Sequence, residues 1–580
     1  MSGPEEVVNI ASALSAMARS RPYAMAVACP AGRDREGRAA YTHLTFQQLD
    51  RESDQLARGL TEIGVGHGVR TVLMVKPGLE FFALTFALFK AGAVPVLIDP
   101  GMGIKNLGRC LKQAKPYAFI GIRRAQLARK ILRWAKASIR IAITAEYSSS
   151  NRAIVEGPPS RPIGDGVLSL SLFDLKRAAR SNGPFPITAT RSGDLAAILF
   201  TSGSTGPPKG VEYSHGIFAA QVHMLRDLYK IEPGEIDLCT FPLFALFAPA
   251  LGMTSVVPEM DATRPAHVDP AKIIDAIESF GATNMFGSPA LLRRVSDYGA
   301  EIGIKLPSLR RVISAGAPVP ARVLERFATM LSPGVQIFTP FGATESLPVA
   351  SIGSDEILNE TRHATDRGSG VCVGRPVAGM TVEIIKITDD AIPAWSDNLT
   401  VPDGTVGEIV VKGPVVTRRY FDSPEPTSRA KIRDIIPPSE TSEEATVIHR
   451  MGDLGYRDEH GRIWFCGRKS HRVTSSEGTL YTIPCEAVFN THPKVNRTAL
   501  VGLGPIGRQR PVLCIEPKRW PVSKADRDEI VSGLKAIGQE FEPTRSIDTF
   551  LFRKSFPVDI RHNAKIFREK LAVWASRRVR

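Results

Sequence analysis

A run of hydroxyl-bearing residues, glycines and one lysine follows an apolar segment near position 200. The apolar segment LAAILF ends at Phe200. The next residues that offer a hydroxyl, a closely approachable backbone or a charge are Thr201, Ser202, Gly203, Ser204, Thr205, Gly206 and Lys209. Groups of this kind bind the phosphate oxygens of a nucleotide. The sequence therefore predicts a polyphosphate site at the end of a strand.

Two better-known loop types do not fit this segment. It lacks the G-x-x-x-x-G-K-[ST] spacing of a Walker A loop, and Ser202 occupies the position where G-x-S-x-G requires its first glycine. A flexible serine and glycine linker is the structural alternative. Such a linker would neither follow an apolar strand nor hold a lysine between two prolines and a glycine. We therefore interpret residues 201–210 as a phosphate-binding loop.

Four further motifs follow this loop along the chain. They are SAGAPVP at 314–320, FGATES at 341–346, MGDLGYRDEHGRIWFCGRK at 451–469 and HNAKIFREKL at 562–571. Together with the loop they resemble, in the same order, the motifs of the acyl-adenylate-forming superfamily, which includes acyl-CoA synthetases, luciferases and nonribosomal adenylation domains. The resemblance covers at least Leu199 to Leu571. Five motifs in register are more specific than any single one.

The resemblance implies that one group of residues binds ATP, with the loop holding the β- and γ-phosphates. The residues implied outside the loop are Gly316, Ala317, Pro318, Phe341, Gly342, Asp453 and Arg468. A carboxylate at Asp453 can accept hydrogen bonds from both ribose hydroxyls. Taken alone, Asp453 could be a turn residue and Arg468 a surface charge. ATP and Mg²⁺ are the expected cofactors.

The same resemblance implies catalytic roles for Lys209, Thr344, Glu345 and Lys565. In adenylation a carboxylate oxygen attacks the α-phosphorus of ATP and expels pyrophosphate, so negative charge must be neutralised on nucleophile and leaving group. Glu345 is the expected Mg²⁺ ligand, Thr344 a donor to the α-phosphate, and Lys565 a bridge between carboxylate and α-phosphate. Taken alone, Lys565 could be one of several basic residues near the C-terminus.

Three positions depart from the pattern of typical CoA ligases. Ser470 occupies the hinge position after GRK, Thr474 replaces a lysine used in thioester formation, and Ala245 replaces the histidine of a P-L-F-H motif. The surrounding residues are apolar and favour a long acyl chain, although ordinary core packing would explain some of them. The predicted substrate pocket consists of Phe241, Phe244, Phe247, Met253 and Ser288.

At these three positions the chain resembles the β-lactone synthetases of bacterial long-chain olefin biosynthesis. That resemblance implies a long-chain β-hydroxy (2-alkyl-3-hydroxy) fatty acid as substrate, capture of its acyl-adenylate by its own β-hydroxyl, and other enzymes of the olefin pathway as partners. The tethered nucleophile would make a CoA site unnecessary. His215 is a candidate to accept the hydroxyl proton, or it is a structural histidine. The alternatives are a long-chain acyl-CoA ligase and a non-catalytic protein that binds acyl groups, nucleotides or membranes.

The elements that must position these residues follow a β-α-β rhythm through the first 340 residues. TVLMV, AVPVLID, AFIGI and IRIAIT are strand-like and alternate with helical patterns. From about Val371 the pattern changes to short alternating strands. We predict an α/β fold with a large ATP- and acyl-binding domain at 1–468, built of two helix-covered sheets and a small β-barrel unit. A mobile α+β domain is expected at 469–580, where GLGPIG (502–507) is interpreted as a turn rather than a dinucleotide site.

Composition narrows the class of protein. The chain has 580 residues, 43% hydrophobic, with 74 basic and 59 acidic side chains and a net charge of +15. Disorder, collagen and coiled coil are excluded, and anionic partners are favoured, although no nucleic-acid partner is predicted. Seven widely spaced cysteines and an N-terminus unlike a signal peptide predict a cytoplasmic protein without a disulfide framework or zinc cluster.

Several segments have distinct local compositions. Residues 238–258 are uncharged, but their prolines and glycine favour a buried segment that lines an apolar cavity over a membrane span. Residues 148–166 and 422–444 are predicted to be surface loops. Residues 101–140 carry 11 basic and no acidic side chains. The apolar stripe of Leu127, Ile131, Leu132 and Ala135 there predicts either a core-facing helix or docking to acidic lipid or a partner.

Overall fold

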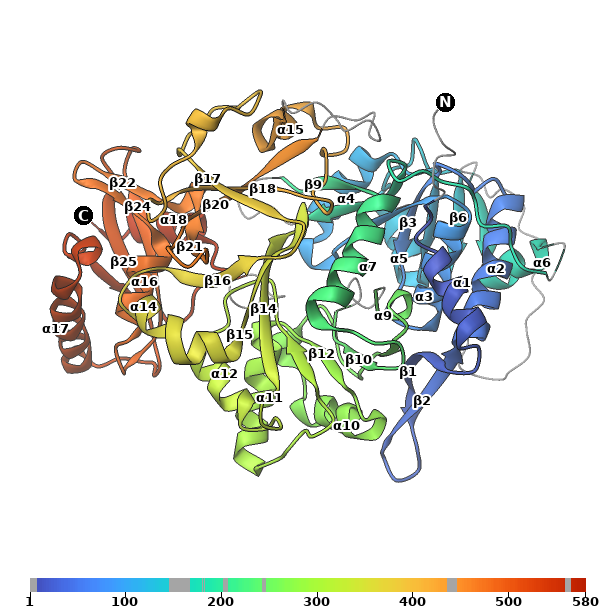
Figure 1. The fold of residues 1–580 in the computed structure, drawn as a ribbon, viewed down its shortest axis with the longest axis horizontal. Helices are drawn as coiled ribbons and strands as arrows, with labels where there is room; N and C mark the ends of the chain where they lie inside the picture. Colours follow the sequence, from blue (N-terminus) through green and yellow to red (C-terminus); the bar gives the residue numbers. More distant parts are fainter. Residues whose placement is uncertain are drawn as a thin grey trace.

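The computed structural model describes residues 8–145, 167–179, 181, 183–201, 207–241, 247–434, 446–558 and 565–579. These residues form two helix-covered sheets and a smaller C-terminal unit, which confirms the predicted α/β class. In Figure 1 the first sheet, in blue and cyan, lies at the opposite end of the molecule from the C-terminal elements, in red.

The first sheet has seven strands in the order β7-β6-β5-β3-β4-β8-β9. All neighbours pair in parallel except β8 and β9. The strands are β3 (Arg70–Met74), β4 (Val94–Ile98), β5 (Ala118–Gly121), β6 (Ile141–Thr144), β7 (Leu168–Ser171), β8 (Leu195–Thr201) and β9 (Lys209–Ser214). The predicted β-α-β rhythm is therefore confirmed.

Helices cover both faces of this sheet because successive strand residues point to opposite sides. Leu73 packs into a core shared with α1 (Ser12–Ser20), α2 (Phe46–Glu62), α3 (Leu79–Lys90) and α7 (His215–Tyr229). Val72 packs on the other face, against α4 (Ile104–Ala114) and α5 (Arg123–Ile131). The short α6 (Leu172–Ala178) follows β7 and packs on α2.

The second sheet has a parallel half and an antiparallel half. The parallel strands are β1 (Met25–Arg33), β10 (Ile236–Cys239), β11 (Thr254–Val256), β12 (Asn284–Phe286), β13 (Arg311–Ile313) and β14 (Gln336–Ala343), with β2 (Ala39–Thr45) antiparallel at the edge. The covering helices are α10 (Pro270–Phe280), α11 (Pro289–Ile302) and α12 (Ala321–Ala328), whose apolar faces form one core with these strands.

The antiparallel half contains the small β unit predicted to begin near Val371. Its strands are β15 (Ser346–Gly353), β16 (Val371–Pro376), β17 (Thr381–Ile385), β18 (Gly407–Lys412), β19 (Lys431–Arg433), β20 (Val447–Arg457) and β21 (Ile463–Arg468). β15 pairs with both β14 and β16, so this unit continues the parallel strands in one 14-stranded sheet. The motifs at 341–346 and 451–469 consequently lie on one connected framework.

The C-terminal unit has cores of its own. Its strands are β22 (Val473–Ser475), β23 (Gly478–Leu480), β24 (Val495–Leu503), β25 (Arg510–Pro517) and β26 (Phe550–Phe552), and its helices are α16 (Thr482–Asn490), α17 (Lys524–Glu540) and α18 (Arg568–Ser576). GLGPIG joins β24 to β25, which confirms that it is a turn between strands. The mobility predicted for residues 469–580 stays a prediction.

One prediction about local structure is wrong, and one of two alternatives is largely excluded. Residues 422–444 are not simply a surface loop, because α15 (Pro424–Ala430) and β19 form within them and Lys431 is buried. For the apolar stripe at Leu127, Ile131, Leu132 and Ala135, the core-facing alternative is wrong for the first three, which are 59%, 68% and 43% exposed, whereas Ala135 packs against a core and Arg129 is buried. The predicted loop at 148–166 lies outside the described residues.

The uncharged segment at 238–258 folds into three short elements. β10, α9 (Phe247–Ala250) and β11 run through it, and residues 242–246 lie outside the described part. Within the described residues, no helix combines the length and apolar character needed to cross a bilayer.

The seven cysteines all lie in described segments, where each is buried and unpaired. Burial raises the pKa of the Cys29, Cys466 and Cys514 thiols to about 12. Burial also raises the thiol pKa values of the other four. Because the thiolate is the reactive form of cysteine, these side chains are chemically quiet in the folded chain.

Candidate functional site

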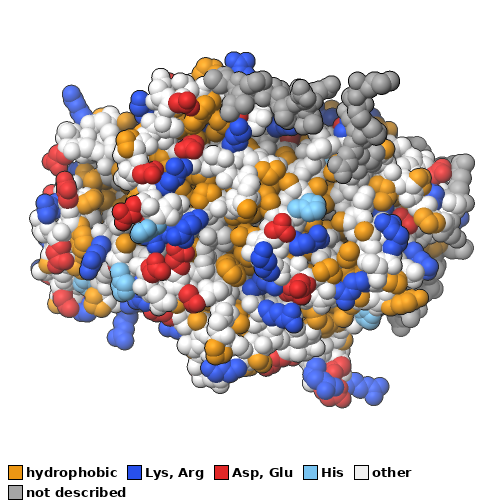
Figure 2. Space-filling view, in the orientation of Figure 1, with side chains coloured by type: hydrophobic (Ala, Val, Ile, Leu, Met, Phe, Trp, Pro, Cys, Tyr) orange, Lys and Arg blue, Asp and Glu red, His pale blue; other side chains and the backbone are white. Residues whose placement is uncertain are grey.

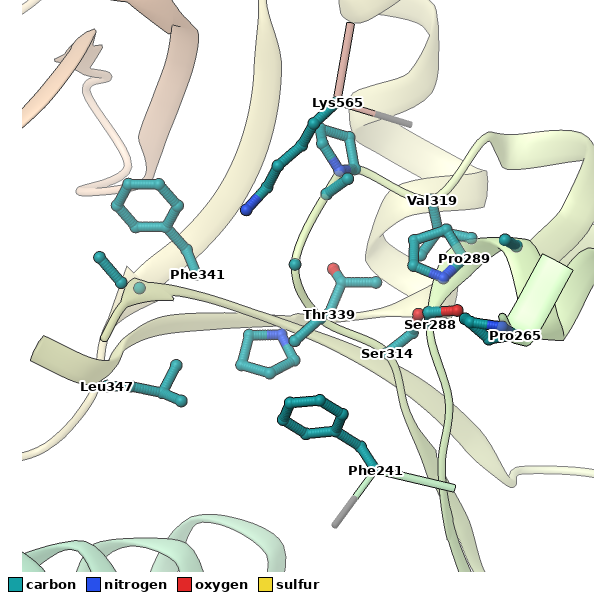
Figure 3. A pocket seen from close by; sticks show the side chains of 18 of the residues that line it. Phe241, Pro265, Ser288, Pro289, Ser314, Val319, Thr339, Phe341, Leu347 and Lys565 are labelled. Atoms are coloured by element: carbon teal, nitrogen blue, oxygen red, sulfur yellow. The ribbon is translucent and has the colours of Figure 1, made fainter. Parts of the chain in front are cut away.

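One cavity of about 2190 Å³ brings together most of the predicted site residues. The predicted residues that line it are Gly316, Ala317, Pro318, Phe341, Gly342, Thr344, Glu345, Asp453, Arg468 and Lys565. In Figure 3, Lys565 extends into the cavity beside Phe341, and Thr339 and Ser314 lie farther in. Strands of the second sheet and the segments that connect them supply most of these residues, and the C-terminal unit supplies Lys565.

Two glycines of these motifs are required by the backbone. Gly316 has φ of +96°, a conformation that side chains with a Cβ atom rarely adopt. A Cβ atom at Gly342 would lie 2.7 Å from the Ser346 carbonyl oxygen. Both glycines therefore let the chain turn tightly at the cavity wall.

The predicted phosphate loop is only partly described. Thr201 ends β8 and pairs in register with Lys209 at the start of β9, so the loop spans the end of an antiparallel pair. Residues Ser202, Gly203, Ser204, Thr205 and Gly206 lie outside the described residues. Lys209 Nζ lies 4.9 Å from the centre of the Tyr420 ring. This contact connects the loop lysine to the side of the cavity that carries Glu345.

Tyr420 holds the Glu345 carboxylate and was missed by the sequence analysis. Its hydroxyl donates a hydrogen bond to Glu345 Oε1 at 2.7 Å. Burial, together with the Glu345 charge, raises the pKa of Tyr420, so the phenol stays protonated and donates. The only sequence signal was an aromatic residue before a segment interpreted as a loop.

The backbone of Glu345 is held as firmly as its side chain. Thr417 donates to the Glu345 carbonyl from its amide at 2.9 Å and from its hydroxyl at 3.1 Å. The buried Lys431 donates in turn to the Thr417 carbonyl and, at 3.2 Å, to its hydroxyl. Burial lowers the pKa of Lys431 to about 7. Lys431 and Thr417 therefore form a second support behind Glu345.

His449 is a further cavity-lining residue that the motifs did not reveal. Its Nδ1 lies 3.1 Å from the Ala430 carbonyl oxygen, which can only accept, so Nδ1 carries a proton. Burial and the nearby Lys431 ammonium lower the pKa of His449 well below its usual range. The neutral ring therefore leaves Nε2 as an acceptor.

We predict that Tyr420→Phe lowers kcat/KM for AMP formation about tenfold, because a hydrogen bond to a charged group is lost while the ring over Lys209 is kept. The loss should grow at limiting Mg²⁺ if the hydroxyl orients Glu345 for the cation. Steady-state rates across a magnesium titration measure this. Tyr229→Phe is the matched control, because the hydroxyl of that buried tyrosine lies 3.4 Å from Ser351 Oγ, and the ring that packs on Phe338 is kept. Equal rates in wild type and Tyr420→Phe would contradict the assigned role.

Asp453 is a buried carboxylate on β20, not an acid in a turn. Its Oδ1 lies 3.1 Å from Arg468 Nη1 on the paired strand β21, yet it accepts no hydrogen bond from the described residues. Burial raises the pKa of Asp453 to about 6, against the opposing charges of Arg468 and Lys565. An unsatisfied buried acceptor beside the cavity suits the ribose hydroxyls.

We predict that the KM for ATP rises as the pH falls below about 6. Protonation removes the charge of Asp453 and part of its accepting capacity, so binding is fully supported only above this pKa. Pyrophosphate release measured against ATP concentration between pH 5 and 8 tests this expectation. Asp453→Asn should raise the KM above pH 6 to about the wild-type value at low pH, and remove the step near pH 6. A step of the same size in Asp453→Asn would assign it to another group.

The described residues suit a Mg²⁺ ion that is bound mainly by substrate phosphates, rather than one that is coordinated by protein side chains alone. Glu345 has a carboxylate fixed by Tyr420 through one oxygen, and no group of three potential His, Cys, Asp or Glu ligands occurs in the described chain. Mg²⁺ is commonly held by one or two carboxylates together with substrate phosphates and water. Glu345 is therefore a suitable single protein ligand.

The predicted acyl pocket is partly brought together. Phe241, Phe247 and Ser288 line the cavity, and Phe241 lies on the far side of Thr339 from Lys565 in Figure 3. Ser288 also accepts a hydrogen bond from the Leu291 amide at the start of α11. Met253 instead belongs to the core of the first sheet and does not line the cavity. Phe244 and Ala245 lie outside the described residues.

His215 does not face the cavity. It is 1% exposed, and its Nδ1 accepts from the Ile10 amide at 3.4 Å. Burial lowers the pKa of His215 to about 4. The structural interpretation of His215 therefore fits better than a role in accepting the hydroxyl proton.

The departures at Ser470 and Thr474 occupy different places. Ser470 lies in the single turn 469–471 and lines the cavity. Thr474 lies on β22, where its carbonyl accepts from the amides of Gly507 and Gln509, and it does not line the cavity.

Comparisons with known proteins agree with this geometry. The family described as AMP-binding enzyme matches residues 16–421. An olefin β-lactone synthetase of Xanthomonas campestris pv. campestris is 49% identical over 569 residues, which cover 98% of this chain and 97% of that protein. A protein of the same name from Stenotrophomonas maltophilia is 48% identical over 570 residues, or 98% of each chain.

Solved structures show the same fold at lower identity. The anthranilate CoA ligase AuaEII, in complex with anthranoyl-AMP, has a TM-score of 0.76 and 18% identity over 99% of this chain and 98% of its own. The amide bond synthetase McbA from Marinactinospora thermotolerans has a TM-score of 0.73 and 22% identity over 98% and 99%. The family match over most of the sequence and the two full-length relatives show that this chain belongs to the AMP-binding enzyme family and is an AMP-forming enzyme of the ligase type.

Proposed function

We propose that this enzyme converts a long-chain 2-alkyl-3-hydroxy acid into a β-lactone at the expense of ATP, with AMP and pyrophosphate as the other products. The observation that carries the proposal is the gathering of Glu345, Asp453 and Lys565 around one cavity that the apolar side chains of Phe241 and Phe247 also line. Identity of 49% to an olefin β-lactone synthetase over nearly the whole chain supports the same reaction.

The chemistry has two steps. First, a carboxylate oxygen of the acid attacks the α-phosphorus of ATP, and the bond to the pyrophosphate oxygen breaks. Lys565 and Lys209 offset the negative charge that accumulates on the phosphates, and Asp453 fixes the ribose. Mg²⁺ held by Glu345 would supply further charge neutralisation on the phosphate oxygens.

In the second step the β-hydroxyl oxygen attacks the acyl carbon. The bond from that carbon to the AMP oxygen breaks, AMP leaves with the electron pair, and the hydroxyl proton passes to a base or to water. Because the nucleophile is already tethered, a strained four-membered ring can form without a second substrate. Activation as a mixed anhydride provides the driving force that the strained ring requires.

The position of Thr474 supports a reaction without CoA. A threonine stands where CoA ligases of this superfamily carry a lysine, and its carbonyl is engaged by Gly507 and Gln509 within the C-terminal unit. We therefore propose that no thiol enters after adenylation. A cytoplasmic location and association with other enzymes of olefin synthesis are part of the same proposal.

Product identity tests the proposal. A β-hydroxy fatty acid is incubated with ATP and Mg²⁺, with and without CoA, and the acyl product is identified by mass spectrometry and NMR. We expect AMP and a product lighter by one water in both tubes. A matched acid without the hydroxyl should stall as bound adenylate, because no second nucleophile is present. An acyl thioester that appears only with CoA would establish the long-chain acyl-CoA ligase instead.

A further inference from the structure

The surface formed by α4 and α5 is strongly basic. Of the 11 basic side chains between residues 101 and 140, ten are exposed and Arg129 is buried. The same stretch has no acidic residue, so it accounts for most of the net charge of +15. Across the face drawn in Figure 2, by contrast, acidic and basic side chains are interspersed.

Large apolar side chains are exposed within this basic layer. Leu127 and Ile131 are four residues apart on α5, so they lie on one face of the helix, with exposures of 59% and 68%. Leu132 follows at 43%, and Ile104 at the start of α4 is 63% exposed. Lys130 is exposed between the two apolar residues of α5. A helix face with apolar residues flanked by lysine and arginine matches the interface of a bilayer.

The two helices form one continuous surface next to the cavity. A Cβ atom at Gly108 of α4 would lie 3.3 Å from Trp134 Nε1, so α4 packs beside the segment that follows α5. Met102 directly precedes Gly103 and α4, Ile122 directly precedes α5, and both line the main cavity. The cavity therefore reaches the base of the basic layer.

We propose that the α4–α5 surface docks the enzyme on an anionic lipid bilayer. Basic side chains would attract acidic headgroups, and Leu127, Ile131 and Leu132 would enter the boundary between headgroups and acyl chains. Resting on the proposed function, this orientation brings the cavity end at Met102 and Ile122 to the lipid in which a long-chain acid dissolves. A protein partner is the less favoured occupant. The patch is strongly basic, with one ion pair from Lys115 to the exposed Asp422, and its exposed aliphatic side chains are separate. Such a patch matches a charged, fluid surface more closely than a shaped interface.

Vesicle flotation of the full-length enzyme tests the proposal. Wild type should float with phosphatidylcholine vesicles that contain about one third phosphatidylglycerol, and at least about tenfold less with phosphatidylcholine alone. Raising NaCl from about 0.05 M to about 0.5 M should weaken binding strongly but leave some residual binding. The double variant Leu127→Ser/Ile131→Ser should abolish this residual binding at high salt. Lys130→Glu/Lys136→Glu should lower binding at low salt at least about tenfold.

The matched control is Lys524→Glu/Lys535→Glu, which makes the same charge change at exposed positions of α17. It should stay within about twofold of wild type, because long-range attraction is screened over a Debye length. All variants should keep wild-type thermal unfolding and AMP formation with detergent-dispersed substrate. Failure of wild type to float with anionic vesicles, or an equal loss in the control, would overturn the proposal. Flotation needs no turnover, so this failure is distinct from failure of the proposed reaction.

Discussion

Lys565→Ala should reduce AMP formation by on the order of 10²–10³-fold, which is the cost of removing one preorganised charge-stabilising group from an active site. Lys565 reaches the cavity from the C-terminal unit and contributes to the electrostatic environment of Asp453. Lys469 also lines the cavity, but its Nζ donates to the Thr388 carbonyl at 2.8 Å and to Glu408 at 3.0 Å. ATP-dependent pyrophosphate release with saturating β-hydroxy acid measures the loss.

Two comparisons make this expectation specific. Lys570→Ala removes a lysine from α18, five residues away, whose Nζ lies over the Phe567 ring, and it should leave the rate within about twofold. Lys565→Arg keeps the charge with a different reach and should restore only part of the rate. Thermal unfolding should be unchanged in all three variants. A Lys565→Ala enzyme that turns over normally would remove Lys565 from the mechanism.

Glu345→Gln should lower AMP formation by on the order of a hundredfold, since a neutral amide replaces the charged ligand proposed for Mg²⁺. The amide keeps the shape of the side chain and still accepts from Tyr420, so the fold should be preserved. Saturation with Mg²⁺ should move to higher concentration, and added Mg²⁺ should recover part of the rate. Isothermal titration of ATP with and without Mg²⁺ separates lost metal binding from lost nucleotide binding.

The control for this variant is Glu477→Gln, an exposed glutamate on the β22–β23 turn. It should keep the wild-type rate and magnesium dependence. If Glu345→Gln lost activity with an unchanged magnesium curve, Glu345 would act on the substrate rather than through the cation. That result would leave the adenylation cavity intact but reassign this residue.

The strand pattern and the motif order could be predicted from the sequence because both are local properties. Strands such as β3 and β4 are short apolar runs between turn signals, and motifs such as FGATES combine residue types that few other chemistries need. The cavity-lining positions of Asp453 and Lys565 follow from such motifs. Their assigned roles in the reaction stay predictions.

Other features depend on contacts between distant segments and leave little trace in the sequence. Tyr420 meets Glu345 across 75 residues, and Lys431 reaches Thr417 from a segment rich in serine, proline and charge. Met253 and Leu127 show the opposite difficulty, since an apolar residue type does not reveal whether its side chain meets a core, a cavity or solvent. Burial of these residues is decided by which elements pack over them.

Because every native cysteine is buried, cysteines introduced at the surface of this chain can be labelled selectively for spectroscopy. Maleimide dyes need an accessible thiolate, and the seven native thiols are enclosed with raised pKa values. A pair of introduced cysteines, such as Thr61→Cys on α2 and Ser532→Cys on α17, would therefore carry the only dyes under native conditions. Energy transfer between the dyes could then follow the C-terminal unit through each catalytic cycle, without first removing any native residue.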